Sequence, residues 1–378
     1  MANGTLNDTY DVVIVGASFA GLVCARTAAM RGLKVAVLEA KEDPGARIHT
    51  TGILVKEAAD EVDLPHTLMR RVHGVRLYAP NLKSIDLFAP GSYFLTTRTA
   101  DLVRWLAEEA RRAGAKILCG ARFTGAERHG QTLRIGAQDI ETRYLIGADG
   151  ARSQVARHFG LGRNTKFLTG LEVEYDGLGD VDPRFLHCFL DSKIAPGYLG
   201  WIAPGPDAMQ VGLAAKSPTR PDLDAFLAKT GRLFDYDQGR IVERRSGRIP
   251  CGGTVSPFAA PGVMLIGDAA GLVSPMTGGG IRLAFRFGRR AAQAISDHLL
   301  DCGPPPEMVL AREYPTFRLK RALRAGLNLA PPNPLIDFGL NATLMRKLAT
   351  RIYFHRAAEP GQSFHDFERT ILSLDDPA

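Results

Sequence analysis

The chain has 378 residues, 45% of them hydrophobic and 23% charged, which suffices for a sizeable core in two domains and excludes a disordered or fibrous protein. Its net charge of +7 fits an anionic membrane surface or a phosphate-rich ligand, whereas nucleic acid is disfavoured because no zinc-finger or RNP-type motif occurs. The five cysteines are scattered without a Cys-x-x-Cys pair and the nine histidines are isolated, so we expect neither a disulfide framework nor a metal site.

The first predicted elements form a compact strand–helix–strand unit. Residues 10–16 are a β-branched apolar run that is typical of a buried parallel strand. Residues 17–32 are rich in alanine and end at Gly32, and residues 34–40 form a second buried strand. This βαβ arrangement is a common nucleotide-binding unit.

Similar elements recur further along the chain. The sequence predicts a helix over 99–113, a strand that ends at Gly150, and an apolar strand over 263–267 followed by a helix over 281–297. Between them lie segments of mixed apolar and polar residues, which suit an antiparallel sheet with one covered face. These segments are 74–79, 84–88, 165–175, 185–190, 198–203 and 208–214.

We therefore predict an α/β protein with a Rossmann-type nucleotide-binding domain, an inserted α+β substrate domain built on an antiparallel sheet, and a helical C-terminal segment. The predicted boundaries are 8–70, 99–164 and 256–300 for the discontinuous nucleotide-binding domain, 71–98 and 165–255 for the substrate domain, and 301–378 for the C-terminal segment.

A glycine-containing turn joins the first strand to the first helix. Gly16 permits the tight turn, Ser18 stands where a third glycine is usual, and Gly21 allows helix and strand to pack closely. The helix N-terminus then offers free amides to a pyrophosphate. Glu39 ends the second strand at the spacing of an acid that binds ribose hydroxyls, which favours FAD or NAD over NADP.

Two further strand ends carry the pattern that selects the dinucleotide. Asp149 and Gly150 end one strand, and Gly267 and Asp268 end another, where a carboxylate can accept a hydrogen bond from a ribityl hydroxyl. Beyond it, residues 277–280 (TGGG) open a helix whose amides can stabilise negative charge on a flavin. Any one of these turns could be structural, but three in this order indicate FAD.

The three motifs together resemble a large flavoprotein family that includes para-hydroxybenzoate hydroxylase, squalene epoxidase and geranylgeranyl reductases. The resemblance implies that Arg98 reaches the FAD pyrophosphate, although a structural salt bridge is the alternative, and that Arg47 lies near the flavin. The predicted FAD-binding residues are Gly16, Ser18, Phe19, Ala20, Gly21, Glu39, Ala40, Arg47, Arg98, Asp149, Gly267, Asp268, Gly279, Gly280 and Ile281.

The details are most similar to the geranylgeranyl reductase branch. Gly271 follows GDAA where aromatic hydroxylases carry histidine, and residues 196–204 (PGYLGWIAP) resemble the reductases' P-x-x-Y-x-W-x-F-P motif in part. The resemblance implies a substrate pocket with Trp201, Tyr198 and His49 as candidate residues. A plain core role for Trp201 remains the alternative.

The resemblance implies an enzyme that reduces carbon–carbon double bonds of a hydrophobic, isoprenoid-type substrate by hydride transfer from reduced flavin. We expect the external reductant to be NAD(P)H or a reduced electron carrier. The alternative is a flavin-dependent monooxygenase, a hydroxylase or epoxidase that acts on an apolar or aromatic substrate.

Residues 316–356 form a basic segment with interspersed apolar residues. Its charged residues are Arg318, Lys320, Arg321, Arg324, Arg346, Lys347, Arg351 and Arg356, against the single acid Asp337. This composition suits peripheral contact with an anionic membrane, with a solvated helical face as the alternative. The short polar N-terminus is unlike a signal peptide, and no apolar run could span a bilayer. We therefore expect a cytoplasmic protein, with peripheral binding to the inner membrane face as a further possibility.

Overall fold

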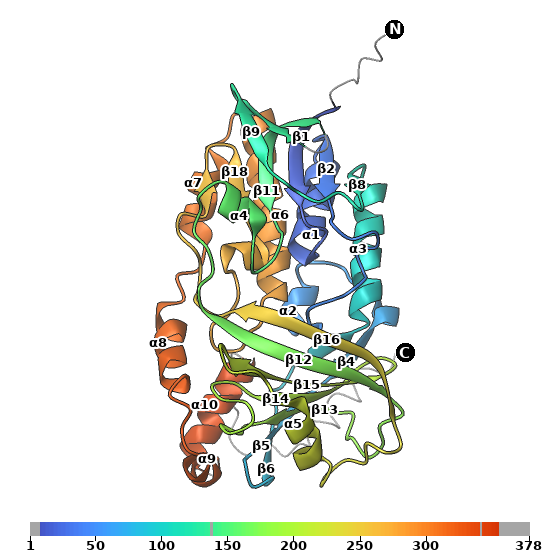
Figure 1. The fold of residues 1–378 in the computed structure, drawn as a ribbon, viewed down its shortest axis with the longest axis vertical. Helices are drawn as coiled ribbons and strands as arrows, with labels where there is room; N and C mark the ends of the chain where they lie inside the picture. The colour runs from blue at the N-terminus through green and yellow to red at the C-terminus, as the bar shows by residue number, and fades with distance from the viewer. Residues whose placement is uncertain (1–7, 137–138, 341, 355–378) are drawn as a thin grey trace. The chain divides into compact units, whose positions relative to one another are not determined.

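A computed structural model describes residues 8–136, 139–340 and 342–354, and the chain forms two compact units (Figure 1). Unit 1 comprises Met1–Ile48, Thr99–Phe167 and Ile249–Ala322, and unit 2 comprises His49–Arg98, Leu168–Arg248 and Leu323–Ala378. The predicted mixed α/β class, with a discontinuous Rossmann-type part, is confirmed.

Unit 1 is an α/β unit around one sheet. Its elements are β1 (Asp8–Val15), α1 (Phe19–Met30), β2 (Val35–Leu38), α3 (Thr99–Arg112), β8 (Lys116–Leu118), β9 (Ala126–His129), β10 (Thr132–Ile135), β11 (Ile140–Gly147), α4 (Gln154–His158), β17 (Ala259–Ala260), β18 (Val263–Leu265), the 3₁₀ turn η3 (Gly267–Ala270), α6 (Ile281–Leu300) and α7 (Pro306–Glu313). Helix α8 (Arg318–Leu327) continues from unit 1 into unit 2.

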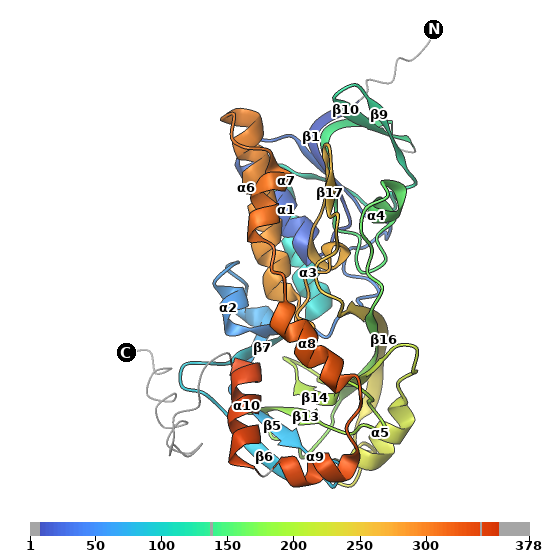
Figure 2. The same ribbon diagram turned by 90° about the vertical axis from the view of Figure 1, so that its left-hand side faces the viewer.

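The sheet of unit 1 has the order β17-β18-β11-β1-β2-β8, with β9 and β10 as an additional hairpin on β11. Strand β1 pairs in parallel with β2 and β11, so that Val13 lies between Ala36 and Leu145. Both faces of this central strand are covered, which explains its unbroken apolar sequence. Figure 2 shows α1 and α6 on one side of the sheet and α4 on the other.

Helices α1 and α6 pack closely because small residues meet at their contact. A Cβ atom on Gly288 of α6 would lie 2.5 Å from the carbonyl oxygen of Ala20 in α1. A Cβ atom on Gly267 would lie 2.9 Å from the Ala20 side chain. These contacts bring η3 and α6 against the first turn of α1.

Unit 2 contains two sheets. Its elements are β3 (Ile53–Val55), α2 (Lys56–Ala59), the 3₁₀ turn η1 (His66–Leu68), β4 (Met69–Val72), β5 (Gly74–Tyr78), β6 (Ser84–Leu87), β7 (Phe94–Thr97), β12 (Phe167–Asp176), β13 (Phe185–Phe189), β14 (Gly200–Pro204), β15 (Met209–Lys216), α5 (Leu223–Thr230), β16 (Arg240–Pro250), α9 (Asn333–Gly339) and α10 (Thr343–Phe354).

The larger sheet of unit 2 has the order β16-β12-β15-β14-β13-β5-β6, and the smaller one has the order β3-β7-β4. The predicted antiparallel pattern holds for six strand pairs in the two sheets, β12–β15, β14–β15, β13–β14, β5–β6, β3–β7 and β4–β7. Strands β13 and β5 pair in parallel. One face of the larger sheet carries an apolar cluster that includes Val173, Ile202 and Val211 and packs on Phe226 of α5. Side chains alternate along a strand, so the neighbouring positions lie on the opposite face.

The observed units and the predicted boundaries differ at several places. Residues 165–167 and 249–255, predicted with the substrate domain, cluster with unit 1. Residues 49–70, predicted with the nucleotide-binding domain, cluster with unit 2 because β3 and β4 both pair with β7. The predicted C-terminal segment 301–378 is divided between the units, and its residues 355–378 lie outside the described part of the chain. The small sheet and β16 were not predicted.

Candidate functional site

The turn between β1 and α1 requires both of its glycines. Gly16 has a φ of +105°, and a Cβ atom there would lie 2.6 Å from the carbonyl oxygen of Ala148. A Cβ atom on Gly21 would lie only 2.1 Å from the carbonyl oxygen of Gly16. Because Cβ atoms do not approach backbone oxygens so closely, no other residue fits either position without a backbone shift.

Ser18 caps helix α1. Its hydroxyl donates to the carbonyl of Ala148 at 3.0 Å and accepts from the amide of Gly21 at 3.3 Å. A phosphate at this position would therefore meet backbone amides rather than the Ser18 hydroxyl proton. The amides of Ser18, Phe19 and Ala20 have no acceptor among the described residues, so the first turn of α1 can hold an anion.

Glu39 links the end of β2 to this turn. Its buried carboxylate accepts from the amide of Ala17 at 2.8 Å and from the amide of Lys41 at 2.9 Å. Each carboxylate oxygen accepts one of these bonds and retains a further lone pair for a hydroxyl donor. Ala40 beside it is exposed, so the edge of the turn is open to a ribose.

Asp149 has a local role that its sequence position did not reveal. One carboxylate oxygen accepts from the Ser153 hydroxyl at 2.6 Å, and the other accepts from the amides of Gln154 at 2.6 Å and Val155 at 3.1 Å. These donors form the N-terminus of α4, so the carboxylate of Asp149 fixes the turn after β11.

Asp268 stands at the start of η3 beside the N-terminus of α6. Its carboxylate accepts no hydrogen bond from any residue that the structure describes, and burial raises its pKa to about 6. A Cβ atom on Gly280 would lie 3.4 Å from one of its oxygens. The N-terminal cap of α6 is Gly280, which supplies no side-chain hydrogen bond, so the first amides of this 20-residue helix also lack a side-chain acceptor.

These groups lie together in unit 1, because Gly267 contacts Ala20 and Gly280 adjoins Asp268. Open amides suit a pyrophosphate, a partly buried carboxylate without a donor suits a sugar hydroxyl, and a second set of helix amides suits an electron-rich ring edge. The residues present therefore fit FAD.

The two predicted arginines differ in their surroundings. Arg47 is exposed, has a φ of +47°, and forms no hydrogen bond or ion pair within the described residues. Arg98 belongs to unit 2, where its guanidinium lies 3.2 Å from Asp207 and donates to the carbonyl of Thr67 at 3.1 Å. Arg98 thus forms the salt bridge that was the alternative to FAD binding, and a role of Arg98 toward FAD stays a prediction.

Comparisons with known proteins agree with this geometry. Residues 9–190 match the family described as an FAD binding domain. A digeranylgeranylglycerophospholipid reductase from Methanothrix thermoacetophila is 32% identical over 310 residues, which are 76% of this chain and 78% of that protein. The chain belongs to the geranylgeranyl reductase family.

This reductase-family protein is thus an FAD-dependent oxidoreductase, as its sequence predicted. A geranylgeranyl diphosphate reductase from Rhodobacter capsulatus is 28% identical over 323 residues, 80% of this chain and 79% of that protein. A geranylgeranyl bacteriochlorophyll reductase-like protein from Thermoplasma acidophilum has a TM-score of 0.79 at 23% identity and covers 97% of this chain and 99% of its own. The latter similarity supports the fold.

In unit 2 of the reductase, Trp201 lies on β14 on the sheet face opposite the apolar cluster. Its ring is 9% exposed, and its indole N–H donates to the Glu172 carboxylate at 2.8 Å. A Cβ atom on Gly212 would lie 2.7 Å from the indole ring. The indole ring of Trp201 therefore packs against the backbone of Gly212 on the neighbouring strand.

Glu172 belongs to a charged cluster that the sequence did not predict. Arg245 of β16 lies 3.5 Å from Glu172, 2.6 Å from Glu174 and 2.5 Å from Glu243. Burial raises the pKa of Glu172, against opposing hydrogen bonds from Thr51 and Trp201. The signal in the sequence was weak: acids alternate at 172 and 174 on one strand, and a charged strand follows some seventy positions later.

The other two pocket candidates have different neighbours. The exposed His49 places its Nδ1 atom 2.8 Å from the carbonyl oxygen of Ser246, so Nδ1 carries a proton that it donates to this carbonyl. Tyr198 is partly buried, with the guanidinium of Arg324 5.8 Å from its ring centre. Thr51, two residues after His49, joins that stretch to Glu172.

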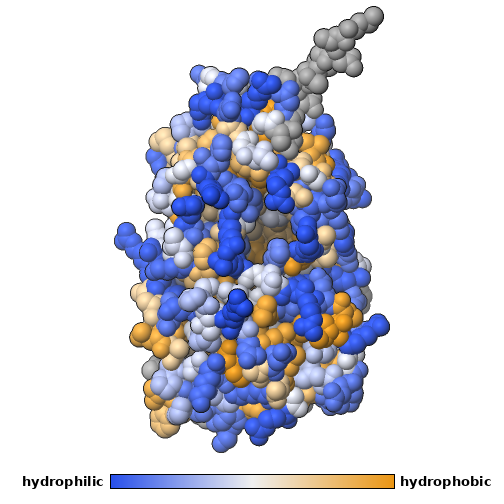
Figure 3. All heavy atoms as spheres, in the orientation of Figure 1, coloured by the Kyte–Doolittle hydropathy of each residue, from blue (hydrophilic) through white to orange (hydrophobic). Residues whose placement is uncertain are grey.

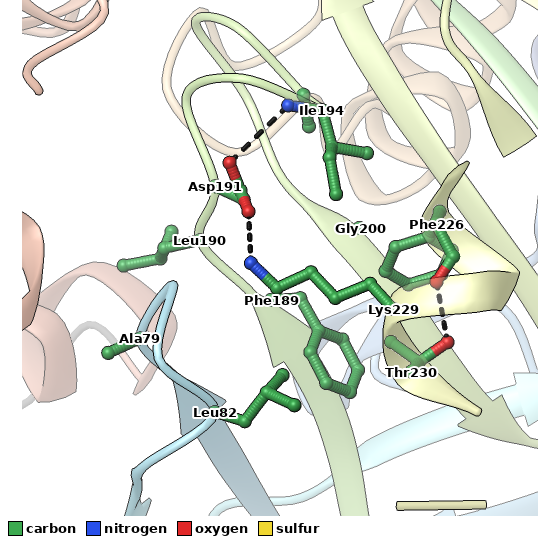
Figure 4. A pocket seen from close by; sticks show the side chains of 11 residues that line it. Ala79, Leu82, Phe189, Leu190, Asp191, Ile194, Gly200, Phe226, Lys229 and Thr230 are labelled. Atoms are coloured by element: carbon green, nitrogen blue, oxygen red, sulfur yellow. Dashed lines mark hydrogen bonds and ion pairs between the residues drawn. The ribbon is translucent and has the colours of Figure 1, made fainter. Parts of the chain in front are cut away.

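A small pocket in unit 2 lies on the opposite sheet face (Figure 4). Apolar residues and the Asp191–Lys229 ion pair line it, and Gly200 forms part of its wall. Gly200 faces α5, since a Cβ atom there would lie 2.4 Å from the ring of Phe226. Trp201 is the next residue along β14 and therefore points away from this pocket.

Proposed function

We propose that this enzyme reduces carbon–carbon double bonds of a hydrophobic isoprenoid substrate by hydride transfer from reduced FAD. The observation that carries the proposal is the 32% identity to a digeranylgeranylglycerophospholipid reductase over 78% of its length. The relative from Rhodobacter capsulatus is named for geranylgeranyl diphosphate, so an isoprenoid chain is common to both named substrates.

The residues of unit 1 bind and orient the cofactor in this proposal. The amides of Ser18, Phe19 and Ala20 hold the pyrophosphate, Glu39 holds the adenosine ribose, and Asp268 accepts from the ribityl chain. The amides of Gly280 and Ile281 at the start of α6 would offer donors to an electron-rich edge of the flavin, where they would stabilise negative charge. FAD supplies the hydride, so the chain itself needs no nucleophile.

Trp201, Tyr198 and His49 are the proposed pocket residues of unit 2. Trp201 contributes an apolar wall, because an indole has no proton to give near neutral pH. His49 is the candidate for proton transfer among the three, since its Nδ1 atom is held by the Ser246 carbonyl and its Nε2 atom is not.

Product analysis under anaerobic conditions tests this function. Enzyme reduced with dithionite is mixed with geranylgeranyl diphosphate or with an unsaturated archaeal-type glycerophospholipid, and flavin reoxidation and product mass are followed. We expect reoxidation by the isoprenoid and the gain of two hydrogens for each double bond reduced. Reoxidation only after oxygen is admitted, with an oxygenated product, would establish the monooxygenase instead.

We further propose peripheral contact with an anionic membrane through α8, α9 and α10. The described part of this region is rich in exposed apolar side chains, among them Phe338 at 85% and Leu329 at 84% exposure. Leu319, Leu323 and Leu327 form one stripe on α8, flanked by exposed arginines. Figure 3 shows hydrophobic side chains (orange) among hydrophilic ones at the lower left, over α8 and α9.

The structure alters the predicted set of cations. Arg324 is 3% exposed and contacts the ring of Tyr198, so it is not part of the surface. Arg356 lies outside the described residues. The exposed cations that remain are Arg318, Arg321, Arg346, Lys347 and Arg351, with Lys320 partly buried. In the portion of the chain that the structure covers, no helix is long and apolar enough to cross a bilayer.

A further inference from the structure

Glu172, Gly212 and Trp201 form one row across three neighbouring strands. In the sheet register, Gly212 of β15 pairs with Glu172 of β12 on one side and with Trp201 of β14 on the other. Because Gly212 has no side chain, the indole can lie across it and reach the carboxylate. The ring is therefore fixed at both ends, by the strand that carries it and by the bond from Nε1 to Glu172.

The carboxylate of Glu172 is directed at the indole more than at the arginine. Arg245 has two closer partners, Glu174 at 2.6 Å and Glu243 at 2.5 Å, whereas Glu172 is 3.5 Å away. The cluster thus keeps its cation paired without Glu172, and three carboxylates face a single guanidinium. Charge balance does not explain why an acid occupies this buried position.

Burial makes this acid costly. Glu172 is 5% exposed, and a buried carboxylate stabilises a fold less than an apolar residue of similar volume does. The same residue nevertheless accepts the hydrogen bond from the Trp201 indole N–H. The hydrogen bond to Glu172 therefore holds the Trp201 indole in one orientation.

We propose that Glu172 is a positioning residue that fixes the ring plane of Trp201 and thereby sets how long an isoprenoid chain the pocket accepts. This inference rests on the proposed function, in which Trp201 forms a wall of the substrate pocket. Glu172 acts through the indole and not on the substrate.

The first experiment observes the indole itself. The chain has two tryptophans, Trp105 and Trp201, so the ¹⁵N-labelled holoenzyme gives two indole N–H signals that Trp105→Phe assigns. In Glu172→Leu we expect the Trp201 signal to move upfield and its proton to exchange faster with solvent, while the Trp105 signal stays in place. Glu172→Gln keeps an acceptor oxygen and should largely restore the wild-type signal.

The second experiment compares chain lengths. For Glu172→Leu we expect KM for a four-unit isoprenoid diphosphate to rise about ten-fold, which corresponds to about 1.4 kcal/mol of binding free energy, because the indole wall no longer keeps one orientation. We expect little change in kcat and less change for a two-unit substrate. Glu172→Gln, which keeps an acceptor oxygen, should have a KM for the four-unit substrate close to that of the wild type. Glu243→Gln is the matched control, because it removes a carboxylate of the same cluster that does not contact Trp201.

Trp201→Phe provides an independent variant that keeps an aromatic wall without the indole N–H. Adding Glu172→Leu to it should have no further effect on the chain-length preference. An unmoved Trp201 signal in Glu172→Leu, or an unchanged preference in an active and folded Glu172→Leu enzyme, overturns the inference alone. A wild-type enzyme that reduces neither substrate refutes the proposed function, and the inference on selectivity with it.

Discussion

The two units build their sites from different materials. In unit 1 the groups that suit the cofactor are backbone amides held by Gly16 and Gly21, with Glu39 and Asp268 as added carboxylates. In unit 2 the proposed pocket depends on side chains that meet across strands, above all the contact between Trp201 and Glu172. A site made of backbone amides depends little on which side chains surround it. A site made of side chains changes with each substitution of one of its residues.

This difference suits the chemistry of the family. FAD is constant, so a site made of amides and glycines can remain the same while substrates vary. The isoprenoid substrate is recognised by shape and apolar area, which single side chains adjust. We therefore expect substitutions at the unit 1 site to weaken FAD binding with little effect on substrate selectivity. Substitutions at the unit 2 site should change substrate turnover with little effect on FAD affinity.

The largest effect is expected for Gly21→Ala. The new Cβ atom would lie 2.1 Å from the carbonyl oxygen of Gly16, so helix α1 must move and its open amides with it. We expect the purified protein to lack flavin, with a loss of FAD affinity of about 100-fold or more by fluorescence titration. Gly326→Ala is the control, because a Cβ atom there meets nothing within 4 Å. Normal FAD content in Gly21→Ala would remove the turn from the cofactor site.

Trp201→Ala comes next and tests the independence of unit 2. Truncation of a buried tryptophan costs about 3–5 kcal/mol of the free energy of unfolding, and here it also leaves Glu172 without its indole donor. We expect a lower melting temperature and lost isoprenoid turnover, while FAD affinity changes by less than about two-fold. A parallel loss of FAD would show that the two sites are not separable.

The glycines of the β1–α1 turn were easier to identify from the sequence than the side-chain contacts of unit 2, for a physical reason. Gly16 and Gly21 are required by backbone geometry within a few residues, so local spacing is sufficient to identify them. The Glu172–Arg245 contact joins positions 73 residues apart on β12 and β16, and no local period marks such a pair. Strand β16 itself is half charged, so its sequence lacks the apolar alternation that indicates a strand.

Asp149 shows the limit of reasoning from motifs. An Asp-Gly pair at a strand end predicted a cofactor ligand, and the structure shows that the carboxylate caps α4 through Ser153, Gln154 and Val155. Its role toward FAD stays a prediction. A capping acid and a ligand-binding acid are identical in sequence at such a turn. At Asp268 the absence of any donor among the described residues is what separates the two roles.

Asp268→Ala is expected to have an intermediate effect. It removes a partly buried acceptor, and a hydrogen bond to a charged group is worth roughly 1.5–3 kcal/mol, so FAD should be held about ten- to a hundred-fold less tightly. Asp149→Ala is the comparison, because its carboxylate is occupied by α4 and its loss should affect stability more than affinity. Equal FAD affinity in wild type and Asp268→Ala would exclude Asp268 from the site.

The raised pKa of Asp268 also predicts a dependence on pH in the flavin-free protein. Burial raises this pKa to about 6 from an ordinary value of 3.8, so the folded state binds the proton more tightly than the unfolded state. The resulting stabilisation is present below about pH 4 and is lost as pH rises through about 6. Between these two pH values, we expect the free energy of unfolding of the wild type to fall by about 1–3 kcal/mol relative to that of Asp268→Asn. Parallel stability curves for the two proteins would contradict the assigned pKa.

The smallest effect concerns the membrane. Exposed leucines and arginines on α8 predict binding to anionic vesicles that weakens as salt rises. Leu323→Ser combined with Leu327→Ser should reduce co-sedimentation several-fold without altering FAD content. Leu233→Ser, an exposed leucine outside this region, serves as control. Binding that is absent at low salt, or equal in all variants, would leave these helices as a solvated face.

Isotope labelling of the product tests the central claim most directly. The enzyme is supplied with an external reductant and a geranylgeranyl substrate in D₂O without oxygen, and in ordinary water under ¹⁸O₂. We predict deuterium at both carbons of each reduced double bond in the first reaction and no ¹⁸O in the product of the second. Incorporation of ¹⁸O, with no deuterated product formed in the absence of oxygen, would contradict the assignment of this chain as an isoprenoid reductase.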